Sequence, residues 1–323
     1  MEFKVYQDKY LDKIVSLWNK EVAEKSIYKP FTAESFTEKF VNNKCFDPEG
    51  FKILFDGNEI IGFGHAIISD VERFPGFITC VVVDEKYQRQ GHGSNILTEL
   101  EKYILEKGKD VVRLYFFNPI NLEWIVPGTN ADHPNAPAIV INSPFYFLLL
   151  ANGYKIRTQE DAFYVDITTY RIPEKVLKRE EENAKDGYNI TLYDPNKHHG
   201  FKELLIDGLN NPEWYKAVQD NLSLEKPYPM LIAEKDGEIL GWTGPIRTQP
   251  SGRGYFAGIG VHPKTQGRGL GKSLFCHLCD ESRKNGAQFM TFFTGKDNPA
   301  RNIYLSAGFK IVQSFAVMEK TLK

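Results

Sequence analysis

The sequence predicts an α+β protein built from two similar domains, each a mixed β-sheet flanked by helices. The chain has 323 residues, more than one hydrophobic core usually organises. A glycine-rich segment occurs twice, as "QRQGHG" at 88–93 and as "QGRGLG" at 266–271, with matching residues 178 positions apart. In each copy, strand-like patterns that include a hairpin come before the glycines, and a helical pattern follows them. That order favours a mixed sheet over a doubly wound parallel one.

The composition is that of an ordinary water-soluble chain, with 42% hydrophobic and 25% charged residues. The net charge of -2 offers no general attraction to nucleic acid or to an anionic membrane. The start of the chain is charged throughout, unlike a signal peptide, and the longest apolar run, "FYFLLLA", cannot span a bilayer. Four cysteines do not make a disulfide framework. We therefore expect a cytosolic protein; the sequence leaves its oligomeric state open.

The two copies predict the same elements in the same order. Each begins with an apolar strand, "FKVY" or "NITLY", followed by helical segments. A hairpin comes next, turning at Asp56-Gly57-Asn58 in the first copy and at Asp236-Gly237 in the second. A further strand leads into the glycines, and an amphipathic helix follows them. We place the first domain at 1–170 and the second at 187–323.

The segment between the copies, residues 171–186, is predicted to be a connecting helix. Pro173 suits a helix start and Gly187 a helix end. Its centre is almost entirely charged, so we expect it to be exposed. A flexible linker is the alternative, because a charged helix without packing is only marginally stable.

The glycine segments predict an anion site, most plausibly for a pyrophosphate. Each lies between a strand and a helix, where free backbone N–H groups and the helix dipole favour negative charge. A P-loop is excluded because Gln266 stands where its first glycine belongs, so we expect no Mg²⁺-dependent ATP site. A dinucleotide fold would need its glycines after the first strand. Two tight turns without a ligand remain the simplest alternative.

These motifs resemble those of the GNAT superfamily of acyl-CoA-dependent N-acyltransferases. The strand "IGVHP" followed by Gln-x-x-Gly-x-Gly resembles its motif A, which occurs in both copies, and "DNPARNIYLSAGF" at 297–309 resembles its motif B. The tandem layout resembles that of mycothiol synthase and related two-domain members. The resemblance implies a twisted sheet whose fourth and fifth strands splay apart, with acetyl-CoA in the opening and no metal.

The resemblance also implies which residues bind the cofactor. The pantetheine arm would pair with the fourth strand, and the pyrophosphate would accept N–H groups from the glycine loop. In the second copy the expected residues are Val261, Gln266, Gly267, Arg268, Gly269, Leu270, Gly271, Lys272 and Asn298. In the first copy they are Val83, Gln88, Arg89, Gly91, Gly93 and Ser94.

Acyl transfer to an amine needs a base for the ammonium, a donor for the oxyanion and an acid for the leaving thiolate. By resemblance, Tyr304 is the general acid, and a backbone N–H near Val261 binds the oxyanion. A tyrosine that only fills the core is the alternative for Tyr304. The base is open among Glu234, Asp297 and a water chain.

The first copy departs from motif B. Aligned from Gly153-Tyr154, it has Leu149 at the tyrosine position and Ser143 at the asparagine position, and Tyr146 lies nearly a turn earlier. The gap from Gly91 to Gly153 is 62 residues, whereas that from Gly269 to Gly308 is 39, so this copy holds about 23 extra residues. They read as a long ordered loop that either covers a pocket or decorates the surface.

The sequence thus predicts an acetyl-CoA-dependent N-acetyltransferase acting on a primary amine of a small molecule or peptide, with catalysis in the second copy. The competing class is a non-catalytic acyl-CoA sensor or interaction protein. Cys276 and Cys279 are spaced like metal ligands but lie in a predicted helix without a second pair, so we expect buried thiols.

Overall fold

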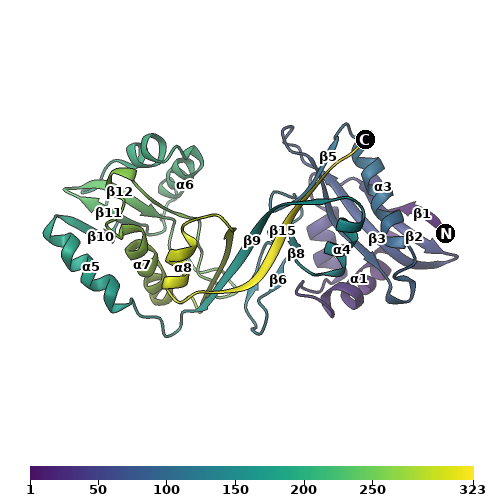
Figure 1. The fold of residues 1–323 in the computed structure, drawn as a ribbon, viewed down its shortest axis with the longest axis horizontal. Coiled ribbons are helices and arrows are strands. Elements are labelled where there is room, and N and C mark those ends of the chain that lie inside the picture. Colours follow the sequence, from purple (N-terminus) through teal and green to yellow (C-terminus); the bar gives the residue numbers. More distant parts are fainter. The chain divides into compact units, whose positions relative to one another are not determined.

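The computed structural model describes all residues from 1 to 323 and divides them into two compact units. The first unit consists of Met1–Ala162 and Val312–Lys323, and the second of Phe163–Ile311. Figure 1 labels the elements. Each unit holds a twisted sheet flanked by helices, which confirms the predicted fold class.

The first unit orders its strands as β1-β2-β3-β4-β5-β15-β9. Its strands are β1 Glu2–Val5, β2 Phe51–Asp56, β3 Glu59–Ile68, β4 Gly76–Val83, β5 Val111–Leu114, β6 Trp124–Ile125, β7 Asp132–His133, β8 Ile139–Val140 and the first part of β9 Lys155–Asp166. Its helices are α1 Leu11–Trp18, α2 Ala33–Phe36, α3 His92–Glu106 and α4 Pro144–Ala151, with the short turns η1 Asp8–Tyr10, η2 Asn19–Ala23, η3 Thr37–Val41, η4 Pro48–Gly50 and η5 Glu85–Tyr87.

The second unit has an antiparallel sheet in the order β10-β11-β12-β13, and its β14 lies beside the end of β9. Its strands are β10 Tyr188–Leu192, β11 Leu231–Lys235, β12 Glu238–Thr243, β13 Ile259–Val261 and β14 Phe289–Gly295. Of β15 Lys310–Thr321, only the first two residues belong to this unit, and the rest lies in the first unit. The helices are α5 Glu174–Lys185, α6 Pro212–Leu222, α7 Leu270–Lys284 and α8 Arg301–Ser306, with the short turns η6 Glu203–Gly208 and η7 Pro263–Thr265.

The hairpins and the helices after the glycines form where the sequence predicts them. β2 pairs with β3 around Asp56, and β11 pairs with β12 around Asp236. The apolar stripe of α7, which includes Leu270, Leu274 and Leu278, is buried in the core of the second unit. Burying one stripe of each helix against the sheet fixes where the glycine loop ends and the helix begins.

The compact units differ from the predicted domain limits of 1–170, 171–186 and 187–323. The chain's last strand, from Val312 onward, lies in the first unit, where Met318 pairs with Leu114 in an antiparallel register. Residues Phe163–Ile311, including the predicted connecting segment, belong to the second unit. Strand partners are chosen through backbone hydrogen bonds, which leave no signal in the residue pattern.

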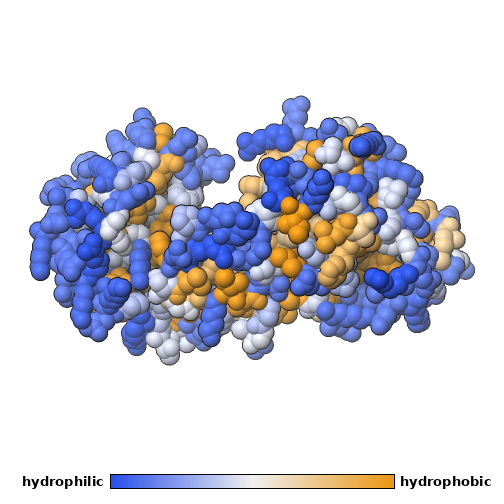
Figure 2. All heavy atoms as spheres, viewed as in Figure 1, coloured by the Kyte–Doolittle hydropathy of each residue, from blue (hydrophilic) through white to orange (hydrophobic).

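The predicted helix between the copies is confirmed as α5, but it is not wholly exposed. Figure 2 shows that its outer face is hydrophilic. Val176 and Asn183 on the opposite face are each only 3% exposed, and Val176 belongs to the core of the second unit. A charged helix is therefore stabilised here by packing.

The extra residues of the first copy form part of that unit's core rather than a surface decoration. Trp124 and Val126 are fully buried. The backbone of Ile125 donates to Ile27 at 2.7 Å, and that of Lys29 donates to Glu123 at 3.0 Å. The insertion is thus tied to the segment before α2 by strand-like pairing.

Candidate active site

The second glycine loop leaves a row of backbone amides without acceptors. Gly269 is the N-cap of α7 and has a φ of 78°, a left-handed conformation that glycine adopts without strain. The first bond of the helix runs from the Ser273 amide to the Gly269 carbonyl at 3.1 Å. The preceding amides of Leu270, Gly271 and Lys272 therefore have no helical acceptor and can bind an anion.

The first glycine loop repeats this geometry. Gly91 caps α3 with a φ of 86°, and the first helical bond runs from Asn95 to Gly91 at 3.0 Å. The amides of His92, Gly93 and Ser94 are left without helical acceptors. Both predicted anion sites thus have the backbone frame that the sequence implies.

The fourth strand separates from the fifth in both units. β4 meets β5 in parallel only at Gly76 and Val112, seven residues before Val83. In the second unit Gly254 donates to Phe289 on β14 at 2.8 Å, again seven residues before Val261, and β13 then pairs only with β12. One edge of each fourth strand is left open, as an extended ligand arm would require.

Tyr304 and Leu149 occupy equivalent positions. The Phe309 amide donates to the Tyr304 carbonyl at 3.2 Å, and the Tyr154 amide donates to the Leu149 carbonyl at 3.1 Å. The residue before each, Ile303 or Leu148, lies against the last glycine of its loop, Gly271 or Gly93. The alignment made from the sequence is therefore correct, and the first unit has no tyrosine at this position.

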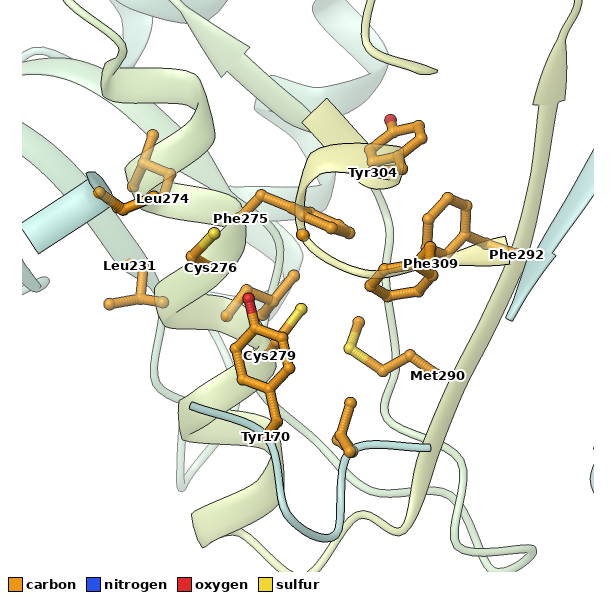
Figure 3. Packing of buried hydrophobic residues seen from close by; sticks show 14 of the residues in the cluster. Tyr170, Leu231, Leu274, Phe275, Cys276, Cys279, Met290, Phe292, Tyr304 and Phe309 are labelled. Carbon is orange, nitrogen blue, oxygen red and sulfur yellow. The ribbon is translucent and has the colours of Figure 1, made fainter. Parts of the chain in front are cut away.

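The ring of Tyr304 is packed among aromatic side chains, whereas its hydroxyl points away from them. The ring centre lies 4.7 Å from that of Phe292 and 4.8 Å from that of Phe275. Figure 3 shows the hydroxyl directed away from Phe309 and Met290. Burial raises the pKa of Tyr304 to about 12. The hydroxyl is thus protonated at neutral pH and can donate.

Both carboxylates considered as the base, Glu234 and Asp297, already have partners within the protein. Glu234 accepts a hydrogen bond from the Asn189 side chain at 2.8 Å and another from the Gly237 amide at 3.0 Å, so it supports the β11–β12 hairpin. Asp297 is 81% exposed and pairs with Lys296 at 3.0 Å. The structure gives neither of them a contact with Tyr304.

The face of β13 turned toward α6 is covered by Trp214. A Cβ at Gly258 would lie 2.5 Å from the Trp214 ring, and one at Gly260 would lie 3.0 Å from it. These glycines are needed because the indole lies directly on the strand. A carboxylate side chain has no room at either position.

Of the polar residues predicted around the second loop, two already have partners within the protein and one has no ion pair. Arg268 pairs with Asp186 at 2.8 Å and lies 4.3 Å above the Tyr188 ring. Asn298 supports the turn before α8, accepting from the Ala300 amide at 3.0 Å. Lys272 has no ion pair, so its ammonium is the open cation at this helix start.

The contacts of α5 with the second loop were not predicted. Asn183 donates to the Arg268 carbonyl at 2.9 Å, and Arg179 makes longer contacts to the carbonyls of Arg268, at 3.3 Å, and Gly267, at 3.4 Å. Arg179 and Asn183 are four residues apart on one helix face. That spacing was the available signal within an otherwise charged segment.

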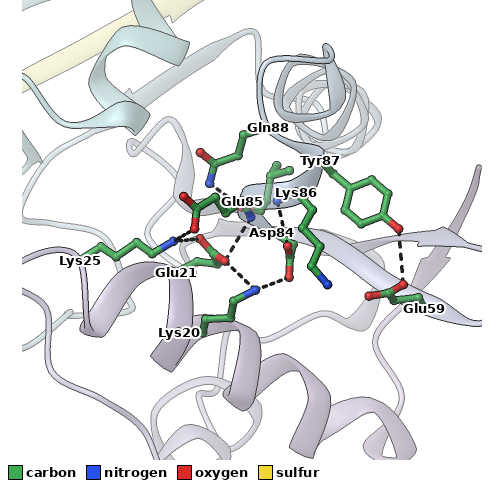
Figure 4. Close-up of polar contacts among 10 residues, drawn as sticks. Lys20, Glu21, Lys25, Glu59, Asp84, Glu85, Lys86, Tyr87 and Gln88 are labelled. Carbon is green, nitrogen blue, oxygen red and sulfur yellow. Dashed lines mark hydrogen bonds and ion pairs between the residues drawn. The ribbon is translucent and has the colours of Figure 1, made fainter.

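The first loop is held from another side. Figure 4 shows Lys20 of η2 paired with Asp84 at 2.7 Å, while Asp84 also accepts from the Lys86 amide at 3.0 Å. The Gln88 side chain donates to the Val83 carbonyl at 2.8 Å, which brings together two predicted cofactor residues. Tyr146 lies elsewhere in the unit, packed against the core cluster around α3.

Three further findings concern the thiols, the possible metal ligands and the lengths of the helices. All four cysteines are free thiols; Cys276 and Cys279 are buried in α7, and burial raises the pKa of both. No cluster of three or more His, Cys, Asp or Glu side chains could hold a metal ion. No helix is both long and apolar enough to cross a membrane.

Comparison with known proteins identifies the class. A family model described as acetyltransferase (GNAT) family matches residues 15–123 and residues 198–309, which together exceed half of the chain. The chain therefore belongs to the acetyltransferase (GNAT) family and carries two copies of its domain.

Particular relatives agree with this assignment. A mycothiol acetyltransferase of Saccharomonospora viridis is 23% identical over 84% of this chain and 81% of its own length. An L-methionine sulfoximine/L-methionine sulfone acetyltransferase of Salmonella typhimurium is 32% identical over 33% of this chain, and this match spans 61% of that relative, less than two thirds. A GCN5-related N-acetyltransferase structure from Sphaerobacter thermophilus matches the fold with a TM-score of 0.62 at 14% identity, covering 99% of this chain and 95% of that one.

Proposed function

We propose that the protein is an acetyl-CoA-dependent N-acetyltransferase that modifies a primary amine of a small molecule or peptide, with catalysis in its second unit. The observation that carries this proposal is the difference between Tyr304 and Leu149. Both units have the anion-binding loop and the open fourth strand, but only the second has a protonated hydroxyl at the helix position beside them.

The residues of the second unit suit acetyl-CoA. The amides of Leu270, Gly271 and Lys272 would hold its pyrophosphate, and the open edge of β13 at Val261 would hold its pantetheine arm. When bound, acetyl-CoA supplies the acetyl group as a thioester. The proton on Tyr304 is then available to the leaving sulfur, because the pKa of about 12 keeps the phenol protonated.

No carboxylate near β13 is available to deprotonate the amine. Glu234 and Asp297 are engaged elsewhere, and the β13 face has no room for a carboxylate. We therefore assign deprotonation of the amine to water that reaches backbone carbonyls near β13. A backbone amide of the same strand would stabilise the oxyanion.

The first unit is proposed to bind acyl-CoA without turnover. Its loop keeps the free amides, but Leu149 has no proton to give. We place the protein in the cytoplasm, since its four thiols are all free.

The proposal is tested by a panel of amines with acetyl-CoA, read by release of the CoA thiol. We expect at least one amine to be acetylated by the wild type and to be acetylated far more slowly by Tyr304→Phe. Absence of thiol release across the panel, with acetyl-CoA bound, would instead favour a non-catalytic sensor.

A further inference from the structure

The segment between β12 and β13 carries an arginine with no acidic partner. The guanidinium carbon of Arg247 lies 3.8 Å from the ring centre of Tyr255 and 5.9 Å from that of Tyr228. The backbone of Tyr255 donates to the Arg247 carbonyl at 2.9 Å, which fixes the two residues side by side. The tyrosines therefore hold the guanidinium in place without neutralising it.

The side chain of Arg247 makes no hydrogen bond and no ion pair. Its Nε is buried without an acceptor, although the side chain as a whole is only half-buried. Other partly buried arginines of this unit are satisfied: Arg268 pairs with Asp186, and Arg283 pairs with Asp280. Because a buried donor without an acceptor is costly, Arg247 is suited to an anion that arrives with a ligand.

The position of Arg247 sets it apart from the cofactor's phosphate site. Tyr255 precedes Val261 by six residues, which is up to about 20 Å along an extended chain. Phe256, the next residue, packs against Tyr304 with ring centres 5.8 Å apart. Arg247 thus lies beside the segment before β13, away from the glycine loop that follows the end of that strand.

The neighbours of Arg247 show on which face of the fourth strand it lies. Tyr228 follows α6 and is tied to Asn221 by two hydrogen bonds, of 2.9 and 3.2 Å. Trp214 of the same helix covers Gly258 and Gly260. Arg247 and α6 therefore border the face of the fourth strand opposite to the core packed around α7 and Tyr304.

We propose that Arg247 binds a carboxylate of the acceptor, so that the substrate class is an amine that also carries a carboxylate, such as an α-amino acid. A planar guanidinium matches a carboxylate in two parallel hydrogen bonds, and its terminal amino groups are not buried. A single guanidinium suits a monoanion better than a phosphate. This inference rests on the proposed function, because it describes the acceptor of that same site.

The experiment compares L-amino acids with the matching amino acid amides, on the wild type, Arg247→Gln and Arg247→Lys. For Arg247→Gln we expect kcat/KM to fall by about 10- to 100-fold for the acids, mainly through KM, and to stay within about twofold for the amides. Comparing each variant with the wild type on the same substrate cancels the different basicity of acids and amides. Arg247→Lys should recover part of the loss.

The control is Arg283→Gln, which removes the same charge from an arginine paired within α7; it should change neither substrate. An equal loss on acids and amides in Arg247→Gln would overturn the assignment, as would unchanged use of the acids.

A binding experiment by calorimetry tests this inference independently of the proposed function. The same acids and amides are titrated into the CoA-bound protein. Acid-selective binding that Arg247→Gln abolishes supports the carboxylate site even if no thiol is released, in which case only the proposed function fails. Equal binding of acids and amides, or no binding of either, overturns the carboxylate site.

Discussion

In the first unit the glycine loop is accompanied by a helix that carries Leu149, whereas in the second unit the equivalent helix carries Tyr304. The two loops are otherwise alike, with N-cap glycines at φ values of 86° and 78°. The free amides of the loop and the tyrosine on the neighbouring helix are therefore separate features. One can be kept while the other is lost.

The two loops also differ in what holds them. The turn before the first loop is fixed by Lys20 and Asp84, whereas the carbonyls of the second loop are held by Asn183 of α5. The second loop thus depends on a helix that precedes its own sheet. Variants in each unit can test whether the two units differ in function.

The largest expected effect is that of Tyr304→Phe. The substitution removes one hydroxyl and keeps the packed ring, so we expect folding and CoA binding to survive. Loss of a general acid should lower kcat by about 10²–10⁴-fold, measured by thiol release under saturating acetyl-CoA. Tyr193→Phe, which removes a hydroxyl at the end of β10, is the matched control and should be silent.

The pKa of Tyr304 also predicts how activity depends on pH. Tyr304 acts as an acid only while protonated, and its pKa of about 12 lies above the assay range. Activity should therefore not fall between pH 7 and about 10 on account of this group. Full activity of Tyr304→Phe would move the chemistry to the first unit, where Tyr146 is the side chain to test.

The next largest expected effect is the loss of CoA binding at one of the two loops. Gly271→Glu places a carboxylate where the pyrophosphate would bind, and we expect CoA affinity there to fall by about 100-fold or more. A Cβ at Gly271 would meet only ordinary contacts, the nearest at 3.4 Å, and an acid near a helix start favours the helix. Loss of binding would thus not reflect unfolding.

Calorimetry with CoA should find two sites in the wild type and one in Gly271→Glu, with turnover lost. Gly93→Glu should remove the other site and leave turnover largely intact. Loss of turnover in Gly93→Glu alone would show that we have assigned catalysis to the wrong unit.

A third prediction concerns acid stability, which should differ between the units. His65 of β3 is fully buried against Phe40 and contacts the Thr79 hydroxyl at 3.0 Å, and burial lowers its pKa to about 3. Below the ordinary pKa of about 6.5 the unfolded chain binds a proton that the folded unit cannot. Stability of the first unit should therefore fall by about 1.4 kcal/mol per pH unit from 6.5 downward, ending near pH 3.

Hydrogen exchange resolves the two units. Protection of β3 and β4 should decline as the pH falls from 6.5 to 4.5, after correction for intrinsic rates, whereas that of β11 and β12 should not follow this course. His65→Gln should flatten the dependence. A slope that persists in this variant would assign it to other groups.

Local elements could be predicted from the sequence because their signals are local. The hairpin turns, the glycine loops and the equivalence of Leu149 with Tyr304 all follow from spacing within one copy. The strand from Val312 onward could not be assigned to the first unit, because β pairing is decided by backbone bonds over long separations. Arg247 was missed for a related reason: an arginine without a partner looks like any other in a sequence.

The smallest predicted effect tests the support of the second loop by α5. Asn183 is 3% exposed and donates to the Arg268 carbonyl at 2.9 Å, whereas the asparagine beside the first loop, Asn152, donates to the Ser94 side chain at 3.0 Å. Asn183→Ala removes this bond, which is worth about 1 kcal/mol, so we expect CoA affinity at the second site to weaken by up to about fivefold. Lys178→Ala, on the exposed face of α5, is the control and should leave affinity unchanged. The first site should be unaffected by either variant. Equal weakening at both sites would mean that α5 acts on the protein as a whole and not on one loop.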